Sequence, residues 1–161
     1  RSGPNPSQAK RLHGFADSDW AVRHSTSGWV VLFQHAAVSY GSKKQKSVAL
    51  SSCEAEIIAL SEAAKDMVYF RKLLSGLDPS SVSGPSDLST DNMGARDLSY
   101  NPEHHNKTKH IERRHLHIRE LRDNGVVDVR YVKTSENVAD MFTKHLARVP
   151  FQKCRKALMS G

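Results

Sequence analysis

The stretch from Val48 to Leu74 constrains the fold more than any other part of the sequence, because it holds the longest helical pattern in the chain. Ser51 and Ser52 are favourable residues for the N-cap of a helix. The apolar residues that follow recur with the period of an α-helix, at Leu60, Ala63, Met67 and Leu74. The sequence therefore predicts a long amphipathic helix that starts at these serines and packs along one side.

Glu56 lies on the apolar side of this predicted helix, four residues before Leu60. Because an α-helix turns by about 100° per residue, Glu54 lies about 200° away from Glu56 and faces nearly the opposite way. Glu54 is interpreted as a first-turn acid that favours the helix dipole. A carboxylate at the edge of a buried face needs a partner. Two partners are open for Glu56: a Lys or Arg at the rim of the core, or a bound cation.

The length and the cysteines limit the class of protein. At 161 residues the chain suits one domain with a hydrophobic core. No apolar run reaches membrane-spanning length, and the start, RSGPNPSQAKR, lacks the apolar segment of a signal peptide. An intracellular protein without a membrane partner is expected. Cys53 and Cys154 lie far apart without a CxxC context, so neither a disulfide framework nor a zinc site is indicated.

The charge of the chain indicates a polyanionic partner. It has 24 Lys and Arg against 17 Asp and Glu, a net charge of +7 and a pI of about 9.6, and nucleic acid is the commonest partner of such chains. Lys43, Lys44 and Lys46 come just before the long helix, where free backbone N–H groups favour anions. The alternative for these lysines is a solvated turn.

The first third of the chain predicts an antiparallel meander. Residues 1–10 are rich in Pro, Ser and Gly and are interpreted as a linker or leader. Strands are predicted over residues 12–17, 29–33 and 36–40, with a turn over residues 23–28. Asp17 falls on the first of these strands.

The rest of the chain alternates helices with strands. A short strand is predicted over residues 87–90, and Asp91 follows it directly. Asp91 is either a functional carboxylate at the end of a strand or the N-cap of the helix that follows. Helices are then predicted over residues 93–99 and 111–123, and a strand over residues 126–132. Thr134 or Ser135 is expected to cap a further helix that begins ENVADMFTKHL. A basic helix or tail is predicted over residues 148–161. This order predicts an α/β fold with a mixed sheet covered by helices.

Four acids occupy comparable places in these elements: Asp17, Glu56, Asp91 and Asp140. Carboxylate oxygens are the ligands that Mg²⁺ prefers, and phosphoryl-transfer sites often hold two metal ions about 4 Å apart. Convergence of the four acids would make such a site.

Several phrases of the sequence resemble the ribonuclease H domain of copia-type LTR retrotransposons. In the family's order they are GFADSDWA, STSGWVV, SYGSKKQKSVALSSCEAEIIALSEAAKD, STDNMGA, NPEHHNKTKHIERRHLHIRE and YVKTSENVADMFTKHL. The resemblance implies a ribonuclease H-like domain over residues 11–147 with a five-stranded mixed sheet of order 3-2-1-4-5 and helices on both faces. It also implies an endonuclease that hydrolyses the RNA strand of RNA–DNA hybrids with two Mg²⁺ ions, for which Mn²⁺ substitutes.

The resemblance also assigns roles to residues and partners. The four acids, with Glu56 as the second glutamate of SSCEAE, would be catalytic metal ligands. Contacts to the hybrid are expected from Lys43, Lys44, Lys46, Ser51, Ser52, Cys53, Asn92, Lys107, Lys109, Arg113 and Arg114. The implied partners are the hybrid and the reverse transcriptase domain of the same polyprotein, with the isolated domain monomeric. The implied setting is a cytoplasmic virus-like particle, or the nucleus.

Some residues depart from the family pattern, and other functions stay open. Cys53 stands where the family commonly has Thr, and KTSEN lacks the mobile His that some ribonucleases H place there. Zinc is not expected from the many histidines of residues 104–117, because structural zinc sites usually mix His with paired Cys. The alternatives are a non-catalytic hybrid-binding or scaffold domain, and another nuclease of the same fold.

Overall fold

A five-stranded mixed sheet forms the centre of the computed structural model, which describes residues 11–100 and 109–159. The strand order is β3-β2-β1-β4-β5, as predicted. The first three strands pair antiparallel, and β4 and β5 extend the sheet in parallel with β1. The strands are β1 (Leu12–Asp19), β2 (Thr26–Phe33), β3 (Ala36–Lys44), β4 (Ser86–Thr90) and β5 (Val127–Tyr131).

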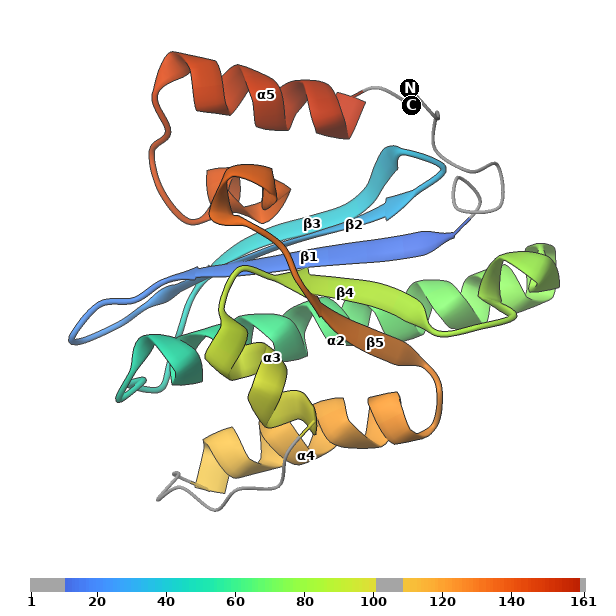
Figure 1. The fold of residues 1–161 in the computed structure, drawn as a ribbon, viewed down its shortest axis with the longest axis horizontal. Helices are drawn as coiled ribbons and strands as arrows, with labels where there is room; N and C mark the ends of the chain where they lie inside the picture. The colour runs from blue at the N-terminus through green and yellow to red at the C-terminus, as the bar shows by residue number, and fades with distance from the viewer. Residues whose placement is uncertain (1–10, 101–108, 160–161) are drawn as a thin grey trace.

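Helices cover both faces of this sheet (Figure 1). One face carries α2 (Ser52–Leu77), α3 (Met93–Tyr100) and α4 (Lys109–Asp123), with the 3₁₀ turn η1 (Pro79–Val82) after α2. The other carries the 3₁₀ turns η2 (Thr134–Glu136) and η3 (Val138–Phe142) and the helix α5 (Arg148–Met159). None of the helices among the described residues combines the length and the apolar character needed to cross a membrane.

The helix α2 begins and packs as its sequence predicts. The hydroxyl of Ser51 accepts a hydrogen bond from the backbone N–H of Glu54 at 3.1 Å, and the Glu54 carboxylate accepts one from the N–H of Leu50 at 2.7 Å. The first bond is the N-cap bond of the helix, and the second ties Glu54 to the residue before the N-cap, in the manner of a capping box. Leu60 and Met67 are fully buried in the core between α2 and the sheet. The interpretation of Glu54 as a helix-start acid is therefore confirmed.

The hairpin of β2 and β3 is longer than predicted. β2 begins at Thr26, inside the predicted turn, and β3 continues to Lys44. Lys43 and Lys44 therefore lie on a strand, where they pair with Ser27 and Thr26, and the prediction of a basic loop holds only for Lys46. The physical reason is that β3 is an edge strand, where charged side chains are tolerated while the backbone completes the ladder.

The predicted helix after β5 is wrong: the chain forms η2 and η3 instead, separated by Asn137. The Asn137 backbone is extended, with φ −81° and ψ 99°. Its buried side-chain amide donates to the carbonyl oxygen of Ala16 on β1 at 2.9 Å and accepts from the N–H of Ala139 at 3.2 Å. A tertiary bond to the sheet thus interrupts the helix that local sequence favours. The helix α5 follows, as predicted for the last segment.

Candidate metal centre

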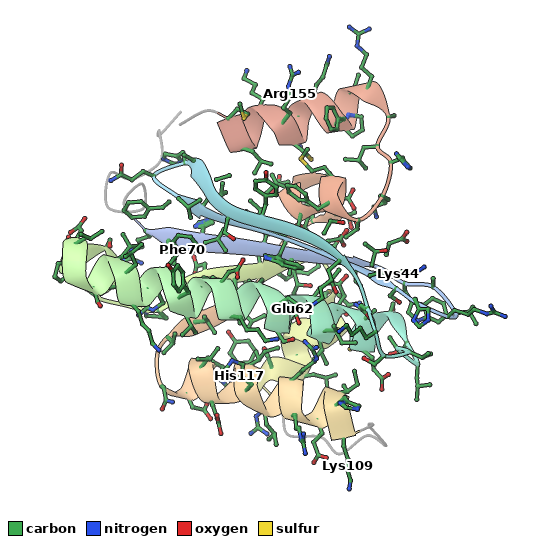
Figure 2. The ribbon with its side chains drawn as sticks, turned by 180° about the vertical axis from the view of Figure 1, so that it is seen from behind. Lys44, Glu62, Phe70, Lys109, His117 and Arg155 are labelled. Atoms are coloured by element: carbon green, nitrogen blue, oxygen red, sulfur yellow. The ribbon has the colours of Figure 1, made fainter. Side chains whose placement is uncertain are left out.

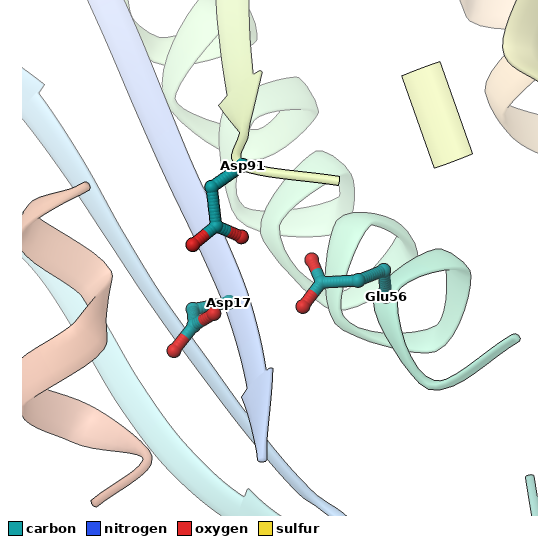
Figure 3. Close-up of side chains that lie close together, drawn as sticks. All are labelled: Asp17, Glu56 and Asp91. Carbon is teal, nitrogen blue, oxygen red and sulfur yellow. The ribbon is translucent and has the colours of Figure 1, made fainter. Parts of the chain in front are cut away.

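Three acids meet where β1, β4 and α2 come together. Asp17 lies on β1, Glu56 in the second turn of α2, and Asp91 directly after β4. One carboxylate oxygen of each lies within 4.8 Å of those of the others, and Figure 3 shows the three side chains pointing toward one another. Asp17 and Glu56 are only 2% and 4% exposed, and Asp91 is half-buried. The cluster has the size and composition of a metal site.

Glu56 is held by hydroxyl and backbone groups rather than by Lys or Arg. Its Oε1 accepts hydrogen bonds from the N–H and the hydroxyl of Ser18, both at 2.7 Å. Its Oε2 accepts one from the hydroxyl of Thr90 at 3.1 Å. Burial raises the pKa of Glu56 to about 7; the negative charge of Asp91 also raises it, and the hydrogen bonds from Ser18 and Thr90 lower it. The carboxylate is therefore fixed to the ends of β1 and β4, and no ion pair joins it to a Lys or Arg of the described residues.

Asp17 is fixed from the opposite face of the sheet. The hydroxyl of Thr143, at the end of η3, lies 2.6 Å from Oδ2 of Asp17 and 3.1 Å from the backbone oxygen of Asp140. The pKa of Asp17 is raised to about 8: burial raises it most, the charges of Glu56 and Asp91 also raise it, and the bond from Thr143 and the charge of Lys144 lower it. Holding these carboxylates together is unfavourable unless protons or cations neutralise them.

Asp140 lies beside this cluster rather than in it. Its Oδ1 is 2.7 Å from the ammonium group of Lys144, one helical turn later in sequence. Burial lowers the pKa of Lys144, yet the hydrogen bond to Asp140 and the charges of Asp17 and Asp91 raise it above its ordinary value overall. Of the four acids predicted to converge, the structure thus brings three within ligand distance and places the fourth next to them, paired with a lysine.

Asn92, not Asp91, caps the helix α3. The side-chain oxygen of Asn92 accepts a hydrogen bond from the N–H of Ala95 at 2.9 Å. The backbone N–H of Asn92 donates to the hydroxyl of Thr90 at 3.2 Å. Because Asn92 supplies the cap, the alternative of Asp91 as a capping residue is wrong, and its carboxylate turns to the cluster.

Gly28 on β2 lets η3 approach the sheet. A Cβ atom at this position would lie 2.7 Å from Cγ2 of Thr143 and 2.9 Å from Cβ of Phe142. Cβ atoms in proteins essentially never lie closer than 3.0 Å to such atoms, and in a close-packed interior the neighbouring groups cannot easily move away. The bond between Thr143 and Asp17 therefore depends on a glycine in the neighbouring strand.

The relatives of this chain come from plant retrotransposons. It is 38% identical over 149 residues to the Retrovirus-related Pol polyprotein from transposon TNT 1-94 of Nicotiana tabacum, a match that covers 90% of this chain and 11% of the relative. It is 37% identical over 145 residues to that from transposon RE2 of Arabidopsis thaliana, covering 88% and 10%. The chain thus spans about a tenth of the length of these polyproteins. No protein-family model matches it.

Solved structures of ribonucleases H have the same fold as this chain. RNase H1 from the halophilic archaeon Halobacterium salinarum superposes with a TM-score of 0.62 at 18% identity, covering 94% of this chain and 99% of that one. LC11-RNase H1 in complex with an RNA/DNA hybrid superposes with a TM-score of 0.59 at 12% identity, covering 82% and 93%. The chain is a ribonuclease H-like domain of the copia-type retrotransposon Pol family. The predicted fold and family are both confirmed.

The predicted substrate contacts of this ribonuclease H-like domain fall into two groups. Ser51, Ser52 and Cys53 lie at the start of α2, where Cys53 is next to Gly94 of α3, and Asn92 lies beside Asp91. The members of this first group lie within five residues of Glu56 or next to Asp91 in the chain. The second group lies on α4 and on β3 and the loop after it, and consists of Lys43, Lys44, Lys46, Lys109, Arg113 and Arg114; Lys107 lies outside the described residues.

The residues that support the acids were not predicted from the sequence. Ser18 directly follows Asp17, and Thr143 and Lys144 follow Asp140 by three and four residues. Side chains at these spacings can meet on a helix, so the pairing of Lys144 with Asp140 carried a signal. Thr143 and Asp17 lie 126 positions apart in the chain, and no sequence pattern indicated the bond between them.

Proposed function

We propose that this domain hydrolyses the RNA strand of RNA–DNA hybrids in a reaction that depends on divalent metal ions. The observation that carries the proposal is the buried cluster of Asp17, Glu56 and Asp91, whose carboxylate oxygens lie within 4.8 Å of one another in a ribonuclease H fold. Burial of like charges at one point is costly. A cluster of this kind, in which hydrogen bonds fix the carboxylates of Glu56 and Asp17, is typical of a cation site.

The residues of the cluster fit Mg²⁺. All its potential ligands are carboxylate oxygens, which hard divalent cations prefer, and neither His nor Cys takes part among the described residues. Asp17, Glu56 and Asp91 would hold the metal, with Asp140 available if it leaves Lys144. When bound, such ions supply positive charge that stabilises developing charge on phosphate oxygens and makes water a better nucleophile. Mn²⁺, with similar ligand preferences, would substitute.

The protein groups around the cluster position these acids. Ser18 and Thr90 each donate to Glu56 and keep its two oxygens turned toward the sheet. Thr143 does the same for Asp17 from the other face. The start of α2, where Ser51 and Ser52 are exposed, is a helix N-terminus and favours a phosphate of the substrate backbone. Recognition of RNA would come from its 2′-hydroxyl groups in the minor groove, with little base specificity.

The test is cleavage of a labelled hybrid by the wild-type domain and by isosteric variants of the acids. We expect Asp17→Asn, Glu56→Gln and Asp91→Asn each to reduce the rate by about 100-fold or more, since metal ligation is lost. Asp19→Asn and Glu54→Gln are matched controls, because these exposed or half-buried acids lie two residues away on the same strand and helix. Binding of hybrid without cleavage, at saturating Mg²⁺ and Mn²⁺, would favour the non-catalytic alternative.

The reverse transcriptase of the same polyprotein is the proposed protein partner. The relatives are about ten times longer than this chain, so the domain is expected to work beside other domains. Size-exclusion chromatography of the domain with the separately purified reverse transcriptase segment tests this partner. Separate elution at micromolar concentrations would argue against a stable interface outside the covalent chain.

A further inference from the structure

A second group of cations lines a groove between α2 and α4, which we call the α2–α4 groove. Figure 2 shows this side of the molecule, with Glu62 of α2 and His117 of α4 on the two helices that border it. Its main hollow has a volume of about 280 Å³. The side chains that line it are Ser61, Lys65, His110, Arg113, Arg114 and His117.

A smaller hollow of about 60 Å³ adjoins the first and shares Arg114 with it. The lining of this hollow includes Lys43, Lys44 and Lys46, from the end of β3 and the loop that follows. The basic lining is therefore continuous from the sheet edge to the middle of α4. Arg114 is fixed at the junction, because its guanidinium donates to the hydroxyl of Ser61 and to Glu62, the latter at 2.8 Å.

The charge of the groove is strongly positive. Its two hollows are lined by six Lys and Arg side chains and by one carboxylate, that of Glu62. Glu62 is already shared between Arg114 at 2.8 Å and Lys65 at 3.1 Å. The remaining positive charge has no matching acid in the lining of either hollow. Such a concentration of like charge in a concave surface attracts polyanions.

The groove lies on the far side of α2 from the acids. Ser61, Glu62 and Lys65 follow Glu56 by five, six and nine residues. At about 100° per residue these positions lie about 140°, 240° and 180° around the helix from Glu56. Because a helix with its side chains is about 10 Å thick, a phosphate at the acids cannot also touch the groove.

We propose that the α2–α4 groove binds the phosphate backbone of the substrate at a distance from the cleaved bond. This inference rests on the proposed function, since it assigns the groove to the same nucleic acid. The side chains of α4 that line the groove extend from His110 to His117, seven residues or about 10 Å along the helix. The groove is therefore long enough to contact more than one phosphate of a nucleic-acid strand, and it increases the length of hybrid that the domain contacts.

The experiment measures binding of hybrids by fluorescence anisotropy in the Asp91→Asn background, so that no cleavage occurs. The groove variant is Lys65→Gln with Arg113→Gln, which leaves the structural Arg114 in place. The matched control is Lys72→Gln with Arg155→Gln, which removes the same charge from exposed positions outside the groove. Each protein is titrated with a long hybrid and with a short hybrid that covers only the cleavage site, at several salt concentrations.

We expect the groove variant to bind the long hybrid about tenfold more weakly and to lower the slope of log K against log salt by about 2, one unit for each phosphate that the variant no longer neutralises. Binding of the short hybrid, and its cleavage when Asp91 is restored, should not change. Hybrids with an RNA or a DNA overhang identify which strand enters the groove. Equal binding of the long hybrid by the groove variant and the control pair would overturn the inference. Failure of the wild type to cleave would instead contradict the proposed function and leave this binding result intact.

Discussion

Glu56→Gln should stabilise the metal-free domain at pH 8, although it lowers the rate of cleavage. In the folded protein the pKa of Glu56 is raised from 4.5 to about 7. The folded state therefore binds a proton more tightly than the unfolded state does. Below about pH 4.5 Glu56 is protonated in both states, so its carboxyl group does not lower the free energy of unfolding. As the pH rises from 4.5 through 7, the unfolded state ionises first, and the free energy of unfolding falls.

The size of this effect follows from the pKa difference. Each pKa unit corresponds to about 1.4 kcal/mol, so the rise from 4.5 to about 7 amounts to about 3 kcal/mol at pH 8. Glutamine carries no charge, and its oxygen keeps the bonds from Ser18, while Thr90 can accept from its amide group. We expect a gain of up to about 3 kcal/mol, or about 6–12 °C in Tm for a domain of this size.

The assay is thermal and urea unfolding of wild type and Glu56→Gln in EDTA at pH 4.5 and pH 8. The gain should be present at pH 8 and absent at pH 4.5, and Mg²⁺ should stabilise the wild type more than the variant. Glu54→Gln serves as the control, because this helix-start acid should show no such gain at pH 8. An equal difference between wild type and Glu56→Gln at the two pH values would refute the reasoning, since it would show that the Glu56 charge is not what destabilises the fold.

Two further substitutions test the elements around the site, and a third tests the opposite end of β4. Gly28→Ala should displace Thr143 from the sheet and lower the cleavage rate by about tenfold or more, with circular dichroism showing a retained fold. Lys144→Gln should free Asp140 and increase the Mg²⁺-induced rise in Tm, and an unchanged rise would contradict the role given to this ion pair. Arg71→Ala should lose three hydrogen bonds, to the end of η1, to Gly84 and to the first residue of β4, and cost about 2 kcal/mol in urea unfolding.

Local patterns in the sequence were sufficient for most of the fold. The apolar period of α2 and the alternation of the strands depend on neighbouring residues, and both were predicted correctly. The two errors have long-range causes. The extension of β3 to Lys44 requires pairing with β2. The break at Asn137 requires the carbonyl of Ala16, which lies 121 residues earlier in the chain.

The candidate site was predicted in part for the same reason. Resemblance to a family selected the acids, and the helical period placed Glu56 on the inner face of α2. The spacing of Asp140 and Lys144 allowed their pairing but did not show that it would keep Asp140 out of the cluster. Neither source indicates that Arg114 bonds to Ser61 and Glu62 of α2, because this contact depends on how α4 packs against α2.

The bonds from η3 to β1 also set the order in which a newly made chain can complete its site. Asn137 and Thr143 meet Ala16 and Asp17 across separations of 121 and 126 residues. All five strands end by Tyr131, so they have been synthesised before these two residues exist. At about 5–20 residues per second, the ribosome adds η3 within about two seconds of the last strand. In a nascent chain the five strands and the three acids are therefore synthesised first, and Asp140, Thr143 and Lys144 follow them.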